Sequence, residues 1–348
     1  MNKILRLICP VMLGFMSVQG ATPNQTMTPI KNDTRVFTVN PDVRVGEVRF
    51  TNRFGIELVG HLYLPTDFDA GKPRAAVALS GPFGAVKEQV SGLYAQELAR
   101  RGFVALAFDP SFTGESGGAA RFVASADINT EDFSAAVDFL SLHPGVDPER
   151  IGIVGICGWG GFALNAAAID TRIKATVTST MYDMHRVSAN GYNDAEDSAA
   201  ARQQKKETLN AIRTADARRG SPEREVPFGT ALPADAPQFV KDYFDYYKTP
   251  RGFHPRSLNS TGGWTKTSVL SLINTPILAY AGEIRTPVLL VHGEKAHSRY
   301  FSETVYSLLP PSHHELHIVP GANHTDLYYR MDKIPFDKIE SFLRENLR

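Results

Sequence analysis

The sequence predicts an α/β protein built on a mostly parallel sheet with helices on both faces. Short apolar runs rich in branched residues alternate with helical stretches along most of the chain, as expected when crossover helices join parallel strands. One such run, residues 151–156, leads through a glycine-rich corner into an apolar helix at 162–169. The chain has 348 residues, 43% hydrophobic and 21% charged, which suits one large globular domain carrying an insertion.

The first 20 residues are expected to be a signal peptide. Two basic residues precede an apolar run at 8–18, and small residues lead up to Gly20, which is the pattern that a signal peptidase recognises. Cleavage before Ala21 would export the chain to the periplasm or beyond and would leave no membrane anchor, because the apolar run is too short to span a bilayer. Residues 21–42 are polar and lack periodicity, so we expect a flexible lead-in.

The core elements follow in order. Residues 43–50 and 56–64 alternate apolar and polar side chains around a short turn, which indicates an antiparallel hairpin. Further strands are expected at 75–80, 103–108, 151–156, 174–180, 286–292 and 314–319, and helices ending at Arg101 and covering 130–142, 162–169 and 336–346.

The corner after the strand at 151–156 is the candidate catalytic element. It reads G-I-C-G-W-G-G (155–161), and a strand, a glycine-rich turn and a helix around a central nucleophile are typical of a nucleophile elbow. The N-terminus of the helix would favour the thiolate form of Cys157. The alternative is a buried structural cysteine. Trp159 stands where such elbows usually have glycine, which indicates either a different turn or a ring packed beside the site.

Cysteine and serine usage supports this choice. Of the 2 cysteines, Cys9 lies in the expected signal peptide, so the mature chain would keep only Cys157 and form no internal disulfide. A literal G-x-S-x-G occurs around Ser116, but no buried strand runs directly into it and no helix follows at once. We therefore assign Ser116 to a loop.

Between residues 184 and 275 the alternation of strands and helices stops. A charged helical stretch at 196–219 and an aromatic-rich helix at 238–247 flank a proline-rich loop. A segment of this length is too long for a plain loop, so we expect a cap over the active site, with the core divided into 43–183 and 276–348. The alternative is a surface appendage without a catalytic role.

His324 is the candidate base. It lies in a loop after the last strand and before the terminal helix, where the chain order nucleophile, acid, histidine places it. A thiol needs such a partner to ionise near neutrality. The backbone N–H groups of Gly158 and Phe83 are the candidate oxyanion donors, with Gly84 in reserve because Pro82 has no N–H.

Five segments in order carry a family resemblance: S-G-P-F-G-A-V-K-E-Q (80–89), A-F-D-P-S-F-T-G-E-S (107–116), G-V-D-P-E-R-I-G-I-V-G-I-C (145–157), H-G-E-K-A-H-S-R-Y-F-S-E (292–303) and G-A-N-H-T-D-L-Y (321–328). With these segments the chain resembles α/β-hydrolases of the dienelactone-hydrolase-like group, including fungal thiohydrolases with a G-I-C elbow. The resemblance leaves the expected cap poorly matched. It implies the α/β-hydrolase fold and a Cys–His–acid site.

The acid departs from the family pattern. The family places it at the last position of the turn H-G-E-K-A (292–296), and Ala296 cannot orient an imidazole. Glu294 in the same turn is the first candidate, and Asp183 after the sixth strand is the alternative. A dyad without any acid is a third possibility, because the pKa of a thiol lies several units nearer neutrality than that of a serine hydroxyl.

These residues predict a hydrolase in which Cys157 attacks an ester, thioester or lactone and His324 moves the proton. An acyltransferase on the same scaffold is the second possibility. The third is a catalytically degenerate binding protein, in which Ala296 marks the loss of turnover. The expected partner is a small-molecule acyl substrate, and a homo-oligomer is compatible with the sequence.

No cofactor, metal or nucleic acid is expected. No dinucleotide fingerprint follows any predicted strand. The histidine pair at 313–314 lacks carboxylates at ligand spacing. The formal net charge of +0 gives no reason to expect binding to nucleic acid or to an anionic membrane surface.

Overall fold

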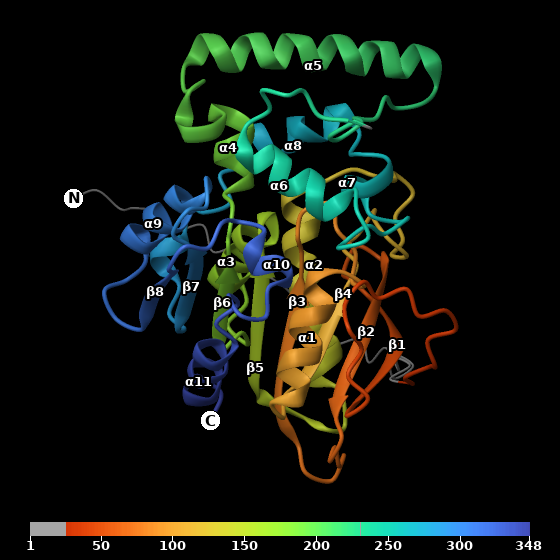
Figure 1. The fold of residues 1–348 in the computed structure, drawn as a ribbon, viewed down its shortest axis with the longest axis vertical. Coiled ribbons are helices and arrows are strands. Elements are labelled where there is room, and N and C mark those ends of the chain that lie inside the picture. The colour runs from red at the N-terminus through yellow and green to blue at the C-terminus, as the bar shows by residue number, and fades with distance from the viewer. Residues whose placement is uncertain (1–25, 230) are drawn as a thin grey trace, which may run out of the picture.

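The computed structural model describes residues 26–229 and 231–348, so the predicted signal peptide at 1–20 lies outside the described residues and stays a prediction. Within the described ranges one eight-stranded sheet has the order β1-β2-β4-β3-β5-β6-β7-β8 (Figure 1). The hairpin β1 (Val43–Thr51) and β2 (Glu57–Pro65) is antiparallel, β2 runs antiparallel to β4, and every later pair is parallel. The predicted fold class is confirmed.

The parallel strands place their carboxyl ends at one edge of the sheet, which is where open α/β sheets bind ligands. Their bounds are β3 (Arg74–Ser80), β4 (Val104–Phe108), β5 (Val146–Ile156), β6 (Ala175–Ser179), β7 (Val288–Gly293) and β8 (His314–Val319). Strand β5 begins before the predicted residue 151 because Val146 already pairs with Arg74, ahead of an irregularity in the register.

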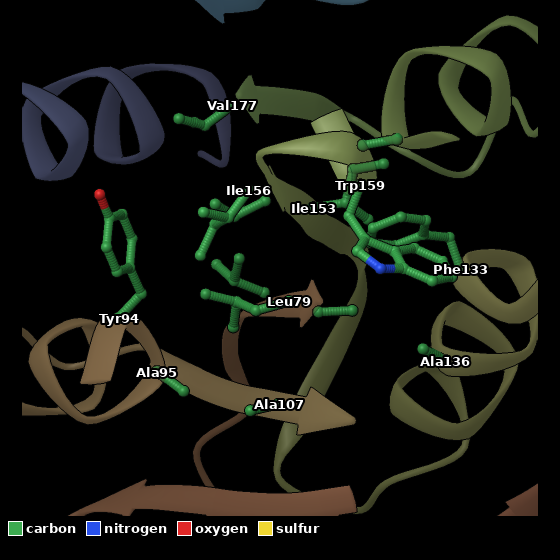
Figure 2. Close-up of a cluster of buried hydrophobic side chains, with 14 of the residues drawn as sticks. Leu79, Tyr94, Ala95, Ala107, Phe133, Ala136, Ile153, Ile156, Trp159 and Val177 are labelled. Atoms are coloured by element: carbon green, nitrogen blue, oxygen red, sulfur yellow. The ribbon is translucent and has the colours of Figure 1, made fainter. Parts of the chain in front are cut away.

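Helices cover both faces of the sheet. On one face α1 (Val90–Arg100) packs against α11 (Phe336–Asn346), with the rings of Tyr94 and Phe336 5.0 Å apart. On the other, α2 (Ala126–Ser141) packs against α3 (Gly158–Ile169). Figure 2 shows Tyr94 of α1 and Phe133 of α2 on opposite sides of the buried strand residues Leu79 and Ile153. The apolar strand runs are thus buried on both faces, as a parallel sheet requires.

The segment between β6 and β7 lies over the carboxyl ends of the strands (Figure 1). It contains α4 (Met184–Asn190), α5 (Ala199–Arg219), α6 (Gln238–Tyr247), α7 (Leu258–Thr261), α8 (Val269–Ile273) and short 3₁₀ turns at Tyr192–Asp194, Lys266–Ser268 and Ala281–Glu283. Helix α5 crosses the top of the molecule and buries only Leu209. The remaining helices are α9 (Arg299–Leu308) and α10 (Asp326–Tyr329). In the ranges that the structure describes, no helix is both long and apolar enough to cross a membrane.

The described part of the lead-in contacts the rest of the molecule at several points. Thr28 pairs with Glu47 of β1, and the N–H of Val36 donates to the carbonyl of Glu88 at 3.0 Å. Thr34 lies 3.0 Å from a ring nitrogen of His254 in the insertion. The polar side chains and backbone groups of this segment form hydrogen bonds with distant parts of the chain. Such long-range pairing leaves no local pattern in the sequence.

A buried cluster of charges ties the core to the insertion. The Nζ of Lys87 lies 3.0 Å from Asp109 and 2.9 Å from Glu88, and it also contacts Glu115. Arg256 of the insertion pairs with both Glu88 and Glu115. Buried carboxylates are tolerated only with such partners, so this charge cluster fixes the loop after β3 against the end of β4.

Candidate active site

Cys157 forms the corner between β5 and α3 in a strained conformation, with φ 56° and ψ −128°. Its N–H donates to the carbonyl of Ser179, and its own carbonyl accepts from Gly160 and Tyr182, each at 2.9 Å. A positive φ costs a non-glycine residue about 1–3 kcal/mol and is concentrated at functional sites. The surrounding backbone therefore holds Cys157 in a conformation that it would not adopt alone.

Helix α3 begins at Gly158 rather than at the predicted residue 162, because the glycines of the corner are helical. A Cβ on Gly160 would lie 2.4 Å from the Cβ of Met181. A Cβ on Gly158 would lie 2.8 Å from the Cβ of Phe83. The missing side chains let the first turn of the helix approach the neighbouring loops.

Trp159 does not line the site. Its ring is 1% exposed and packs 6.0 Å from Phe133 and 5.0 Å from Phe162, within the core layer between α2 and α3 (Figure 2). The tryptophan that replaces the usual glycine of the turn is thus a packing residue of the core.

Four polar groups surround the side chain of Cys157. The backbone N–H groups of Phe83 and Gly158, the two predicted oxyanion donors, hydrogen-bond to it, and so do the hydroxyls of Tyr328 and Tyr243. Burial raises the pKa of the thiol, and these hydrogen bonds offset the rise only in part. The thiolate expected from the helix N-terminus is therefore not the resting form, because desolvation outweighs the donors.

His324 lies between β8 and α10 and is 2% exposed. Its Nδ1 lies 2.6 Å from the hydroxyl of Ser298 and 2.8 Å from that of Thr180. Its Nε2 lies 2.9 Å from the hydroxyl of Tyr328. In the described residues no hydrogen bond joins His324 directly to Cys157, and the hydroxyl of Tyr328 lies between them.

Neither predicted carboxylate contacts the imidazole. The exposed Glu294 accepts the N–H of Gly321 at 2.7 Å, and Asp183 caps α4 by accepting the N–H of Arg186 at 3.1 Å. No carboxylate hydrogen-bonds to His324 in the part of the chain that the structure describes.

Hydroxyls take the place of the acid. Ser298 lies two residues beyond Ala296 in the turn where the family places its acid, and Thr180 follows β6 with a φ of 47°. The sequence does not predict either residue, because the family pattern points to a carboxylate and because serine and threonine are too common to stand out. The clue in the sequence is that Ser298 follows Ala296, the position of the family's acid, by only two residues.

The hydroxyl network continues to a second buried histidine. His292 places Nε2 2.9 Å from Ser298 and Nδ1 2.7 Å from Ser302. Burial lowers the pKa of His292 to about 3 and that of His324 well below its usual value. A neutral imidazole has one donor and one acceptor nitrogen, so the hydroxyls orient His324 without any formal charge.

Alkylation of Cys157 by iodoacetamide is expected to accelerate with pH in a single step whose midpoint lies above that of a free thiol. Burial disfavours the thiolate and raises the pKa of Cys157, so the thiol predominates at pH 7 and the thiolate forms as the pH passes the raised pKa. Mass spectrometry of the Cys157 peptide measures the rate. A reactive plateau that extends into weak acid, typical of a thiolate–imidazolium pair, would contradict this prediction.

A cavity of about 140 Å³ adjoins Cys157. Its other lining residues carry no formal charge at pH 7 and come mostly from the insertion: Phe83, Tyr182, Met184, Val187, Tyr192, Phe228, Tyr243, Tyr247, Asn259 and Tyr328. An apolar cavity of about 150 Å³ holds a benzene molecule. The space beside the sulfur therefore suits a compact, uncharged group.

The insertion also holds the loop that carries Phe83. The ring of Phe83 stacks on Trp264 with the centroids 4.2 Å apart, and Asn259 donates to the carbonyl of Phe83 at 2.7 Å. These contacts leave the backbone N–H of Phe83 facing Cys157. The position of this donor thus depends on contacts from the insertion as well as on the charge cluster.

Ser116, in the literal G-x-S-x-G, has a structural role. Its hydroxyl donates to the carbonyl of Asp109 at 2.6 Å and accepts the N–H of Val59 at 2.9 Å, and it does not line the cavity at Cys157. Among residues 26–229 and 231–348, no group of histidine, cysteine and carboxylate side chains could hold a metal ion.

Comparison with protein families identifies one matching family. The model described as the dienelactone hydrolase family matches residues 62–182. This range begins in β2, ends after β6, and includes the corner at Cys157.

A closely similar relative occurs in Pseudomonas aeruginosa (strain PAO1), described as uncharacterized protein PA2218. It is 56% identical over 317 residues, which cover 90% of this chain and 84% of the relative. The crystal structure of PA2218, at 55% identity, has a TM-score of 0.88 and covers 93% of this chain and 100% of the other.

Relatives with named activities match a smaller part. Thiohydrolase aneE of Aspergillus aculeatus is 36% identical over 139 residues, 40% of this chain and 42% of that protein. Polyketide transferase grgF of Penicillium sp. is 30% identical over 131 residues, 38% of this chain and 43% of that protein. The crystal structure of the α/β hydrolase GrgF from Penicillium sp. sh18 shares the fold, with a TM-score of 0.67 at 20% identity over 87% of this chain and 99% of that one.

Proposed function

Because the chain belongs to the dienelactone hydrolase family of α/β-hydrolases, we propose that it cleaves an ester, thioester or lactone through Cys157, with His324 as the base. One observation carries the proposal: two backbone N–H groups converge on the sulfur at a strained corner. A carbonyl carbon bonded to that sulfur would hold its oxygen beside the same two donors. Such donors stabilise the developing oxyanion.

The reaction has two halves. The sulfur attacks the carbonyl carbon, its proton passes to His324, and the carbonyl electron pair moves onto oxygen. The intermediate collapses with release of the alcohol or thiol, which takes the proton from His324 and leaves an acyl group on Cys157. In the second half His324 deprotonates a water molecule that attacks this thioester, and the carboxylic acid leaves as the thiol is restored.

The cavity limits the substrate class. Its lining carries no formal charge and encloses about 140 Å³, so a charged acyl group would be desolvated without a partner. We therefore expect a compact, uncharged acyl group. Esters, thioesters and lactones suit a thiol nucleophile better than amides, because their leaving groups depart more readily.

The test uses acetyl to decanoyl p-nitrophenyl esters and the matching thioesters with the wild-type enzyme and the Cys157→Ala variant. Short-chain substrates are expected to react fastest, and Cys157→Ala is expected to lower kcat by about 10⁴-fold or more, as loss of a nucleophile does elsewhere. An unchanged kcat in a folded Cys157→Ala variant would refute the proposed function.

Acyl transfer is the second candidate, and the aromatic lining of the cavity favours it, because bulky rings around the sulfur leave less room for water to reach an acyl-enzyme. One partial relative is named a thiohydrolase and another a polyketide transferase. Adding an alcohol or amine acceptor during turnover separates the two functions. A hydrolase forms mainly the free acid, whereas a transferase forms mainly the new ester or amide.

A further inference from the structure

Tyr328 links the sulfur to the imidazole. Its hydroxyl lies 2.9 Å from Nε2 of His324. Tyr328 and Cys157 line the same cavity, and the hydroxyl interacts there with the thiol. Of the three hydroxyls that contact His324 among the described residues, only that of Tyr328 also interacts with Cys157. A proton that leaves the sulfur for His324 therefore has a direct path through Tyr328.

The structure holds Tyr328 firmly in this position. Its side chain is fully buried, and its ring packs 5.2 Å from that of Tyr246 and 5.3 Å from that of His324. The preceding carbonyl, of Leu327, accepts a hydrogen bond from the hydroxyl of Tyr94 at 2.8 Å. Ring packing and the hydrogen bond to the adjacent backbone thus both fix the position of the Tyr328 hydroxyl, as a preorganised catalytic group requires.

We propose that Tyr328 relays the proton between Cys157 and His324. In the resting site the thiol donates to the Tyr328 oxygen and the Tyr328 hydroxyl donates to Nε2. On attack the S–H and O–H bonds break while new O–H and N–H bonds form, so the sulfur electron pair is released, the imidazole gains one proton and tyrosine stays neutral. When the intermediate collapses, Nε2–H of the imidazolium donates to the Tyr328 oxygen while the Tyr328 hydroxyl gives its proton to the departing alkoxide or thiolate, so the imidazole and the tyrosine both end neutral.

The hydrogen bonds at Nδ1 of His324 indicate that the proton moves from Tyr328 to Nε2. Ser298 and Thr180 occupy Nδ1 of His324, so Nδ1 can carry the proton and Nε2 faces Tyr328 as an acceptor. Burial holds the pKa of Tyr328 well above its usual value, which disfavours a free tyrosinate. The two transfers are therefore expected to be concerted.

Tyr243 also lies beside the sulfur, but its hydroxyl connects Cys157 to Tyr182 and His297 and not to His324. Its hydroxyl lies 3.0 Å from that of Tyr182, which in turn contacts His297. No hydroxyl orients the second ring nitrogen of His297 among the described residues, whereas His324 has two such partners. The observations therefore favour Tyr328 as the relay and leave Tyr243 as a donor to the thiolate.

The relay rests on the proposed function, and its test separates the two. Tyr328→Phe, His324→Gln and the double variant are compared with the wild-type enzyme on a short-chain thioester, and Tyr246→Phe is the control. Tyr246 lies against the ring of Tyr328 and does not line the cavity at Cys157. For each protein kcat/KM and the pH dependence of Cys157 alkylation are measured.

If Tyr328 is the relay, Tyr328→Phe lowers kcat/KM by about 10²-fold or more, and the double variant is no worse than His324→Gln, because the two residues act as one unit. Alkylation of Cys157 moves to higher pH in Tyr328→Phe and stays unchanged in Tyr246→Phe. A merely structural role for Tyr328 would not move that midpoint.

Near wild-type turnover in Tyr328→Phe, or losses that multiply in the double variant, would overturn the relay. If Tyr328→Phe does not fold, fluorotyrosine at position 328 retains the hydroxyl and makes it a stronger acid. The relay then predicts a changed pH profile of kcat, and an unchanged profile refutes it. If Cys157→Ala is inactive and Tyr328→Phe is fully active, the relay fails while the proposed function stands.

Discussion

Replacing His324 with glutamine is expected to lower kcat/KM by about 10²–10⁴-fold, the contribution of a general base. Glutamine offers an amide oxygen and an amide nitrogen to Ser298, Thr180 and Tyr328, the three hydroxyls around the imidazole, but it cannot take up a proton near neutrality. Loss of activity should therefore come with little loss of stability. Steady-state kinetics and thermal unfolding of the same samples measure the two effects.

His143→Gln is the matched control. His143 is a partly buried histidine that contacts the rings of Phe68 and Phe139 and accepts the N–H of Gly145 at 3.2 Å, and it does not line the cavity at Cys157. Its replacement should leave kcat/KM unchanged. A His324→Gln variant as active as this control would show that another group accepts the proton.

Replacing Lys87 with methionine is expected to destabilise the fold by about 3–5 kcal/mol, because it leaves the buried carboxylate of Asp109 without its cation. Lys87 is fully buried and bridges Asp109, Glu88 and Glu115. Methionine preserves most of the apolar stem, so lost packing contributes little. Urea unfolding at pH 7 measures the difference, provided that the transition is two-state.

Lys174→Met provides the comparison for this effect. Lys174 pairs with Glu149 at 2.8 Å near the surface, and such pairs contribute about 0–1 kcal/mol. Equal losses in the two variants would show that the buried cluster adds nothing beyond an ordinary ion pair. Lys87 follows the loop that carries the oxyanion donor Phe83. We therefore also expect a reduced kcat in the fraction of Lys87→Met protein that remains folded.

Local patterns made much of the fold predictable. The strands are predictable because branched apolar runs alternate with helical stretches. The corner at Cys157 is predictable because its glycines lie between a strand and a helix. The sequence predicts the start of α3 too late, at residue 162, because glycine disfavours helices in general. Here the close approach of Met181 and Phe83 decides the local structure instead.

The partners of His324 could not be read from the chain in the same way. Thr180, Ser298 and Tyr328 come from three segments that only the folded sheet brings together. Each is a common residue without a motif of its own. The family pattern predicts a carboxylate in the turn that contains Glu294, whereas the structure places neutral hydroxyls around the ring.

The most direct measurement is rapid acid quenching of the wild-type enzyme during turnover of a short-chain thioester, followed by peptide mass mapping. We predict a mass increase equal to the acyl group on the peptide that contains Cys157, and its disappearance when the substrate is exhausted. Turnover with Cys157 unmodified throughout, or an acyl group on Ser116, would contradict the assignment of Cys157 as the nucleophile.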